Sequence, residues 1–144
     1  MQDVMRALFS STGRINRKTY WTILLCIGMA GVVLRFIIEG FGDNPIALIF
    51  LPVALTITVA GINNYIKRLH DLGRSGWWIL AALGACIALG MLLSIVAGDN
   101  PAAAALVALS PLVPAIWLGS VKGQPSDNRF GPAPAAGDAT AAFD

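Results

Sequence analysis

Four long runs of apolar residues, separated by short polar segments, most constrain what this chain can fold into. They lie at residues 20–38, 45–66, 77–96 and 101–121. Since a helix rises about 1.5 Å per residue, each run can cross the ~30 Å hydrocarbon core of a bilayer. The chain is 56% hydrophobic, 12% charged and has a mean hydropathy of +0.70, unlike a typical soluble domain. The sequence therefore predicts an all-α integral membrane protein with four transmembrane helices.

A cleaved signal peptide is the alternative interpretation of the first run. Cleavage would have to fall near Gly28-Met29-Ala30, which leaves a very short apolar region after a long basic segment. We therefore expect this run to be a transmembrane helix.

Lysine and arginine fall almost entirely on one side of the predicted arrangement. Nine of the ten lie before the first run, between the second and third, or after the fourth: Arg6, Arg14, Arg17, Lys18, Lys67, Arg68, Arg74, Lys122 and Arg129. Because cytoplasmic loops are enriched in Lys and Arg, this pattern places both termini in the cytoplasm. The net charge of +2 is too small to indicate a nucleic-acid partner.

The same boundaries divide the chain into three parts. Residues 1–19 form a cytoplasmic interfacial segment, residues 20–121 the four-helix transmembrane domain, and residues 122–144 a cytoplasmic tail. Apolar side chains on one side of the first part predict a short interfacial helix: Val4, Met5, Leu8 and Phe9. The Gly-, Pro- and Ala-rich tail is expected to be mobile after about residue 134.

The two predicted outer turns share the sequence GDNP, at residues 42–45 and 98–101. In each, the Asn can cap the next helix and the Pro suits its first position. With the same offset of 56 residues, eight of 25 positions agree between 21–45 and 77–101. Two interpretations stay open: a duplicated hairpin, with halves related by an axis along the membrane normal, or chance similarity of apolar helices with convergent turns.

Arg35 is the one charged residue inside a predicted span, about one turn from its outer end. Glu39 follows at the i+4 spacing that permits an ion pair, and a long side chain there can also reach the headgroups. We expect this pair at the outer interface; a contact with an ion or a substrate is the alternative.

The motif KRLHDLGRSGWW, residues 67–78, joins the second and third runs. Gly73 can end one segment and Ser75 can cap the next helix. Tryptophans commonly anchor membrane helices at the headgroup level. Interfacial anchors are expected at Trp21, Trp77 and Trp78.

His70 and Asp71 in this motif invite a metal or acid–base hypothesis. A metal site needs several ligands, however, and the chain has no second histidine and few acids on this face. Cys26 and Cys86 lie in apolar runs, where neither a disulfide nor a thiolate zinc site is expected. We predict no catalytic residue, metal or cofactor, and a structural network in this loop.

Three motifs together, GRINRKTYW at 13–21, KRLHDLGRSGWW at 67–78 and NRFGP at 128–132, give the chain a family resemblance. It resembles the YhaH-like bacterial inner-membrane proteins, the domain of unknown function 805. The resemblance covers about Phe9 to Pro134. It implies a small multi-span helical protein of the bacterial plasma membrane and supplies no reaction, substrate or cofactor.

All three motifs fall on the predicted cytoplasmic face. We therefore expect one polar cap or anionic-ligand site, formed by Asn16, Arg17, Lys67, Arg68, His70, Asp71, Arg74, Asn128 and Arg129. In this hypothesis His70 and Asp71 hold the loop in shape. Arg17, Arg74 and Arg129 face a shared anionic partner, which is a headgroup phosphate or the chain's own carboxylates and carbonyls.

Three classes of function remain open. The first, which we favour, is a structural or scaffolding membrane protein whose cap binds lipid headgroups or a membrane-protein partner. The second is a small oligomeric transporter or channel that uses the helices interrupted by Pro52, Pro111 and Pro114. The third is a membrane enzyme that uses His70 and Asp71. Expected partners are the bilayer with its anionic headgroups, a second copy or another membrane protein.

Overall fold

The structure is a computed structural model that describes residues 8–42, 44–98 and 100–134. Its helices are α2 (Arg17–Gly40), the 3₁₀ helix η1 (Pro45–Phe50), α3 (Leu51–Asp71), α4 (Trp78–Ala97), α5 (Pro101–Leu109) and α6 (Leu112–Ser120). The described residues contain no strand, and one isolated bridge pairs Asn128 with Gly131. Four helical segments are long and apolar enough to cross a membrane. The prediction of a four-span helical membrane protein is confirmed.

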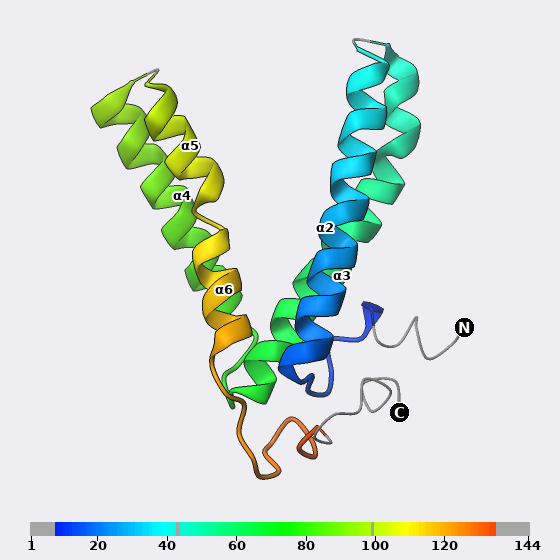
Figure 1. Cartoon of the computed structure of the whole chain (residues 1–144), viewed down its shortest axis with the longest axis vertical. Coiled ribbons are helices and arrows are strands. Elements are labelled where there is room, and N and C mark those ends of the chain that lie inside the picture. The colour runs from blue at the N-terminus through cyan, green and yellow to red at the C-terminus, as the bar shows by residue number, and fades with distance from the viewer. Residues whose placement is uncertain (1–7, 43, 99, 135–144) are drawn as a thin grey trace.

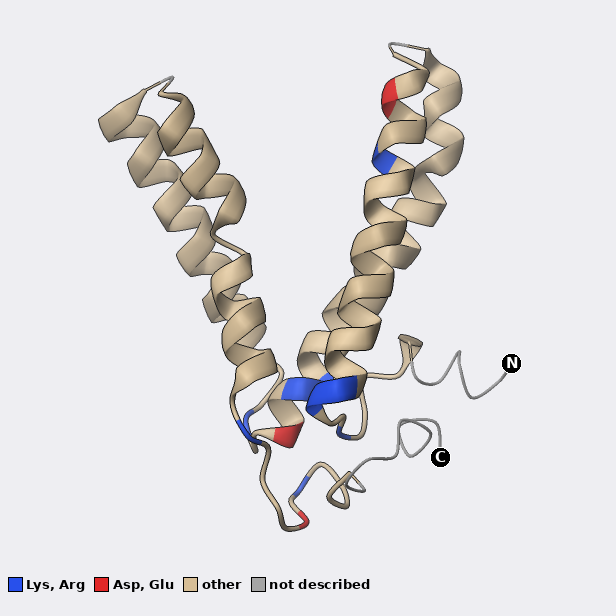
Figure 2. Cartoon of the chain, in the orientation of Figure 1, with Lys and Arg blue, Asp and Glu red and all other residues tan. Residues whose placement is uncertain are grey.

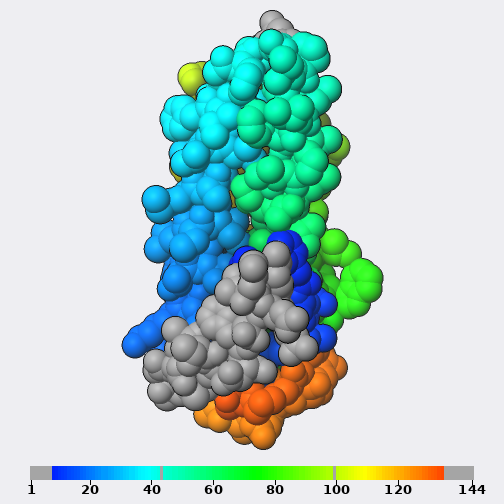
Figure 3. Space-filling model, turned by 90° about the vertical axis from the view of Figure 1, so that its right-hand side faces the viewer, coloured from blue at the N-terminus to red at the C-terminus, as the bar shows by residue number. Residues whose placement is uncertain are grey.

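The helices form two antiparallel hairpins that together make a V (Figure 1). One hairpin is α2 with η1 and α3; the other is α4 with α5 and α6. They meet at one end, called here the inner end, and diverge toward the GDNP turns. Figure 3 shows α2 and α3 side by side along their length, with the segment after α6 beneath the inner end.

Both outer turns use the same local geometry. Gly42 and Gly98 have φ of 54° and 56°, a left-handed conformation that suits glycine. The Asn44 side chain accepts a hydrogen bond of 3.0 Å from the amide of Ile46, and Asn100 caps α5 in the same way. The capping predicted from GDNP is confirmed. The duplication of the whole hairpin stays a prediction.

The prolines leave the second span continuous and divide the fourth. Pro52 lies in the first turn of α3, where its missing amide costs no helical hydrogen bond. Pro111 separates α5 from α6 and cannot donate to the carbonyl of Val107, four residues earlier. The Ser110 hydroxyl donates to that carbonyl at 2.8 Å. The Val107 carbonyl, which Pro111 leaves without its helical donor, is therefore hydrogen-bonded within the same span.

The buried core lies at the inner end, where the two hairpins meet. Its members are Ile15, Tyr20, Leu69 and Leu118. The Tyr20 hydroxyl donates to the carbonyl of Ala115 at 3.0 Å and so joins α2 to α6. Elsewhere the spans are largely exposed, which suits surfaces that face lipid rather than water.

Helix α3 continues past the predicted limit of the second span, residue 66, to Asp71. Lys67, Arg68, His70 and Asp71 therefore belong to a helix, and the connection to α4 is shorter than the predicted loop. The hypothesis that His70 and Asp71 shape a loop is corrected in this respect. The predicted interfacial helix falls largely on residues 1–7, and the predicted mobility falls on residues 135–144; both lie outside the described residues.

Gly119 of α6 offers a test of the contact between the hairpins. A Cβ at this position would collide with the ring of Trp21, whose Nε1 donates to the Gly119 carbonyl at 3.2 Å. We expect Gly119→Ala to destabilise the protein by about 1–3 kcal/mol, as overpacking does. The matched change Gly84→Ala meets open space and should not destabilise. Thermal unfolding in detergent measures both, and equal melting temperatures would contradict the packing.

Candidate functional site: an aspartate and two arginines at the inner end

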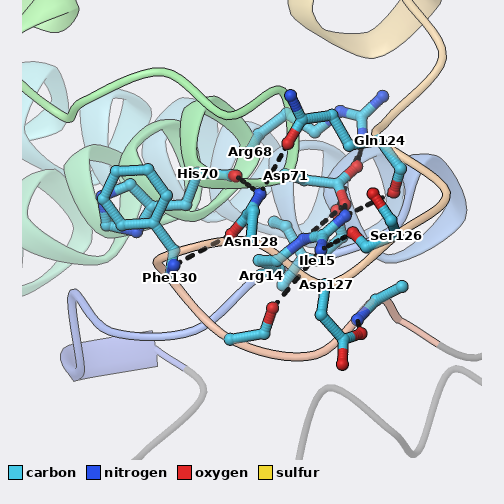
Figure 4. Close-up of polar contacts among 12 residues, drawn as sticks. Arg14, Ile15, Arg68, His70, Asp71, Gln124, Ser126, Asp127, Asn128 and Phe130 are labelled. Carbon is cyan, nitrogen blue, oxygen red and sulfur yellow. Dashed lines mark hydrogen bonds and ion pairs between the residues drawn. The ribbon is translucent and has the colours of Figure 1, made fainter.

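Asp71, the last residue of α3, binds two arginines with its carboxylate (Figure 4). Oδ1 accepts from Nε and Nη2 of Arg14 at 3.2 and 3.1 Å. Oδ2 accepts from Nη1 of Arg68, which lies one turn earlier on α3. The three side chains are at most 4% exposed. A buried carboxylate thus lies between two buried guanidinium groups.

Arg68 connects α3 to the elements packed around it. Its Nε donates to the carbonyl of Leu118 at 2.9 Å, and Nη1 also donates to Ile15 at 3.3 Å. Nη2 donates to the carbonyl of Val121, just after α6. All three nitrogens have acceptors, and four of the five N–H groups donate, so most of the donors of this desolvated group are satisfied. One side chain therefore joins the N-terminal segment, α3 and the end of α6.

Arg14 holds the C-terminal segment against the same carboxylate. Nη2 donates to the carbonyl of Gln124 at 2.5 Å, and Nη1 donates to Ser126 at 2.8 Å and to Gly131 at 3.4 Å. The amide of Gln124 in turn donates to the backbone carbonyl of Asp71 at 2.9 Å. The segment after α6 is thereby folded back on α3.

A second layer forms around His70. Its ring lies parallel to that of Phe130, with centroids 3.9 Å apart, and its Nδ1 is 3.3 Å from the carbonyl of Gly13. Nδ2 of Asn128 donates to the His70 carbonyl and to Oε1 of Gln124, both at 2.9 Å. The NRFGP motif therefore docks on the end of α3; a wholly free tail was the alternative. We call residues 13–17, 67–74 and 120–131 the inner cap.

The other predicted cap residues have separate roles. Asn16 caps α2 by accepting from the Thr19 amide at 2.8 Å, and Lys67 is buried on α3. Nη1 of Arg17 donates to the carbonyl of Ser120 at 3.5 Å. The guanidinium of Arg129 lies over Phe130, 4.7 Å from its ring centre.

Arg74 lies over a different pair of rings, 4.6 Å from the ring centre of Trp78 and 5.7 Å from that of Trp117. Arg17, Arg74 and Arg129 thus each contact a different part of the described structure. Among the described residues they share no carboxylate or carbonyl, and Asp71 binds Arg14 and Arg68 instead. The other alternative, a shared headgroup phosphate, stays a prediction.

The predicted interface residues lie as follows. Trp77 and Trp78 at the start of α4 are 77% and 52% exposed, whereas Trp21 is half-buried against Gly119. Toward the outer end, Nε of Arg35 lies 2.7 Å from Oε1 of Glu39, and both side chains are exposed.

Arg14 is the residue of this site that the sequence prediction omitted. It lies in the GRINRKTYW motif, where a basic residue before a span is explained by cytoplasmic placement alone. Its burial depends on the return of residues 124–131, which hydrophobicity patterns do not show. One indirect sequence signal was present. Asp71 is the one acid among the predicted cap residues, which include several arginines, so an arginine partner for it could be expected.

Asp71 and His70, the two residues of the acid–base hypothesis, both make contacts within the inner cap. Both oxygens of Asp71 bind arginines, and the His70 ring is stacked on Phe130. The residues that the structure describes contain no group of three or more His, Cys, Asp or Glu side chains able to hold a metal ion.

Fold and site together define a small multi-pass helical membrane protein whose two hairpins are joined by a buried polar cluster. Residues 8–132 match the family described as "Protein of unknown function (DUF805)", and the chain belongs to this family.

Two relatives extend the comparison. Each is described as "Uncharacterized protein YiiR", one from Escherichia coli strain K12 and one from Escherichia coli O157:H7. The chain is 30% identical to each over 131 residues, which is 89% of this chain and 88% of the relative. No solved structure matches the chain.

Replacement of Asp71 by asparagine tests the buried cluster. Asp71→Asn removes the charge while keeping a similar shape, so two buried arginines lose their anion. We expect a loss of about 3–5 kcal/mol of stability and faster proteolysis between α3 and α4. The control Asp127→Asn changes an exposed acid that accepts from the amide of Ala133, and should shift stability by less than about 0.5 kcal/mol. Similar unfolding of both variants would contradict the cluster's role.

Proposed function

We propose that this protein is a non-catalytic scaffold of the bacterial inner membrane. In this proposal the inner cap fixes the two hairpins relative to each other, and an apolar cleft between them binds a molecule from within the bilayer. The observation that carries the proposal is the open apolar cavity that lies between the joined hairpins, next to the inner cap.

This cavity has a volume of about 560 Å³, within the ~300–1,000 Å³ range of small-molecule sites. It lies between α3, α4 and α6, and no charged side chain lines it. Its lining residues are Thr58, Gly61, Ile62, Tyr65, Leu69, Trp78, Ile79, Ala81, Ala82, Leu83, Cys86, Pro111, Pro114, Trp117 and Leu118. Such a lining suits an apolar group that arrives from the bilayer.

The charge distribution supports the location. Figure 2 shows the described lysines and arginines gathered at the inner end, with one exception on α2. The basic residue of α2 toward its outer end is Arg35. The positive-inside rule makes this end cytoplasmic. Bacterial outer-membrane proteins are typically β-barrels, so a helical multi-span chain with relatives in Escherichia coli fits the inner membrane.

A transport path is less well supported, because several polar side chains of the spans donate hydrogen bonds to backbone carbonyls of the chain. Three hydroxyls donate to the carbonyl four residues earlier, at 2.8–2.9 Å: Thr56, Thr58 and Ser94. Nδ2 of Asn63 donates to the backbone carbonyl of Leu8, and Nδ2 of Asn64 donates to that of Tyr20. These groups stabilise the fold instead of lining a continuous polar route.

An enzyme that uses His70 and Asp71 is also less well supported. A general base must reach the proton that it removes, and a nucleophile needs a base within hydrogen-bond distance. Asp71 binds two arginines, and His70 is held by Phe130 and Gly13. Both side chains are thus committed to the inner cap.

Photocrosslinking in native membranes tests the proposal. A benzophenone amino acid in place of Ile62, which lines the cleft, should capture a selected set of molecules. The same group in place of Leu25, an exposed residue of α2 outside the cleft, should capture lipids in proportion to the bulk membrane. Mass spectrometry of the adducts makes the comparison. If the adducts at Ile62 also reproduce the bulk composition, the cleft selects nothing and the proposed function is wrong.

A further inference from the structure

We propose that the cleft binds an anionic phospholipid of the inner leaflet, with its phosphate at Arg74 and one acyl chain in the cavity. This inference rests on the proposed function, because it identifies the molecule that the cleft would hold. It depends on one cation, Arg74, which lies over two aromatic rings of the uncharged cavity lining. The end of the cavity at these rings, nearest the inner cap, is called here its inner mouth.

Arg74 is held at this mouth by two kinds of contact. Its backbone amide donates to the carbonyl of Leu69 at 2.9 Å, and Gly73 before it makes a left-handed turn with φ of 71°. Its guanidinium lies over Trp78 and Trp117, and both of these rings line the cavity. A cation stacked over aromatic rings is attracted to their faces and keeps its N–H groups in a plane that can meet an acceptor.

The Arg74 charge has no anion beside it in the described structure. Within residues 8–42, 44–98 and 100–134, no carboxylate pairs with it and no acceptor binds its guanidinium. The nearby acid in sequence, Asp71, is occupied by Arg14 and Arg68. An arginine can bind a phosphate through two parallel hydrogen bonds, and the cytoplasmic leaflet is rich in anionic lipid.

The cavity continues from this cation in the direction that an acyl chain takes. Its lining on α3 extends from Leu69 near the inner end to Thr58, eleven residues away, or about 16 Å along the helix at ~1.5 Å per residue. Acyl chains of the inner leaflet run from the headgroups toward the bilayer centre, roughly parallel to such a helix. A phosphate at Arg74 therefore places an acyl chain over the apolar lining.

A second copy of the chain fits this face less well. Most homodimers are two-fold symmetric, so the same face of both copies would meet at the same depth in the membrane. That arrangement would bring two unpaired Arg74 guanidiniums close together, and like charges repel. A lipid phosphate instead neutralises the charge, so charge complementarity favours the lipid.

The test compares two lipids with the same acyl chains, phosphatidylglycerol and phosphatidylcholine, added to the delipidated full-length protein in detergent. Native mass spectrometry measures the dissociation constant of each. We expect wild type to prefer phosphatidylglycerol, and Arg74→Gln to weaken its binding about tenfold, the effect of losing one charge-assisted interaction. The matched variant Arg129→Gln removes another arginine that lies over a ring, away from the cavity, and should bind like wild type.

A second pair of variants tests the acyl chain. Ala82→Phe fills the lined cavity and should weaken binding of both lipids, whereas Ala85→Phe changes a residue of α4 outside the lining and should not. Glycerol 3-phosphate, which has no acyl chain, should not displace bound phosphatidylglycerol. Unchanged melting temperatures for the four variants show that they are folded.

Three results would overturn the inference: equal affinity of wild type for the two lipids, equal effects of Arg74→Gln and Arg129→Gln, or a dimer that forms through the cleft and is lost in Ala82→Phe. The proposed function is tested separately. If Ile62 captures a selected molecule that is not an anionic lipid, the cleft still binds a ligand and this identification alone is wrong. If Ile62 captures only bulk lipid, the proposed function fails as well.

Discussion

The rest of the structure depends on the ion pairs that the Asp71 carboxylate makes with Arg14 and Arg68. The carboxylate offsets one of their two positive charges, at a depth where both arginine side chains are at most 1% exposed. Those two arginines then donate to backbone carbonyls before α2, at the end of α6 and in the returning C-terminal segment. Removal of one partner from a buried ion pair is costly because it leaves a charge without compensation. Three segments distant in sequence are consequently joined at one point.

This arrangement explains why a largely exposed set of helices has a defined shape. Lipid supplies no hydrophobic driving force between helices, so their association needs close packing and polar contacts. Here both occur at the inner end: Tyr20 packs with Leu69 and Leu118 and donates to the Ala115 carbonyl, and the inner cap adds the polar contacts of Asp71. The outer ends diverge, and the cavity between α3, α4 and α6 stays apolar. The buried polar contacts and the apolar cavity thus both follow from the way the two hairpins meet at the inner end.

The spans were predictable because length and apolar content alone decide whether a helix can cross a bilayer. The caps at Asn44 and Asn100 were predictable for a similar reason: they depend on residues adjacent in sequence. The partners of Asp71 were not, since Arg14 is 57 residues away and its burial requires the C-terminal segment to fold back. Arg74 was recognised as a candidate for phosphate binding, but its neighbours Trp78 and Trp117 come from different helices. Contacts between distant segments depend on packing that hydrophobicity patterns do not contain.

The central claim is that the Asp71 cluster fixes the angle between the hairpins. The most direct test is the distance between spin labels at Leu48 on η1 and Leu106 on α5, two exposed positions toward the outer ends, measured in lipid bilayers after replacement of both native cysteines. We predict one narrow distribution at a separation that corresponds to the open V, and a broad distribution in Asp71→Asn. A wild-type protein with its outer ends in contact, or a distribution that Asp71→Asn leaves unchanged, would contradict the account.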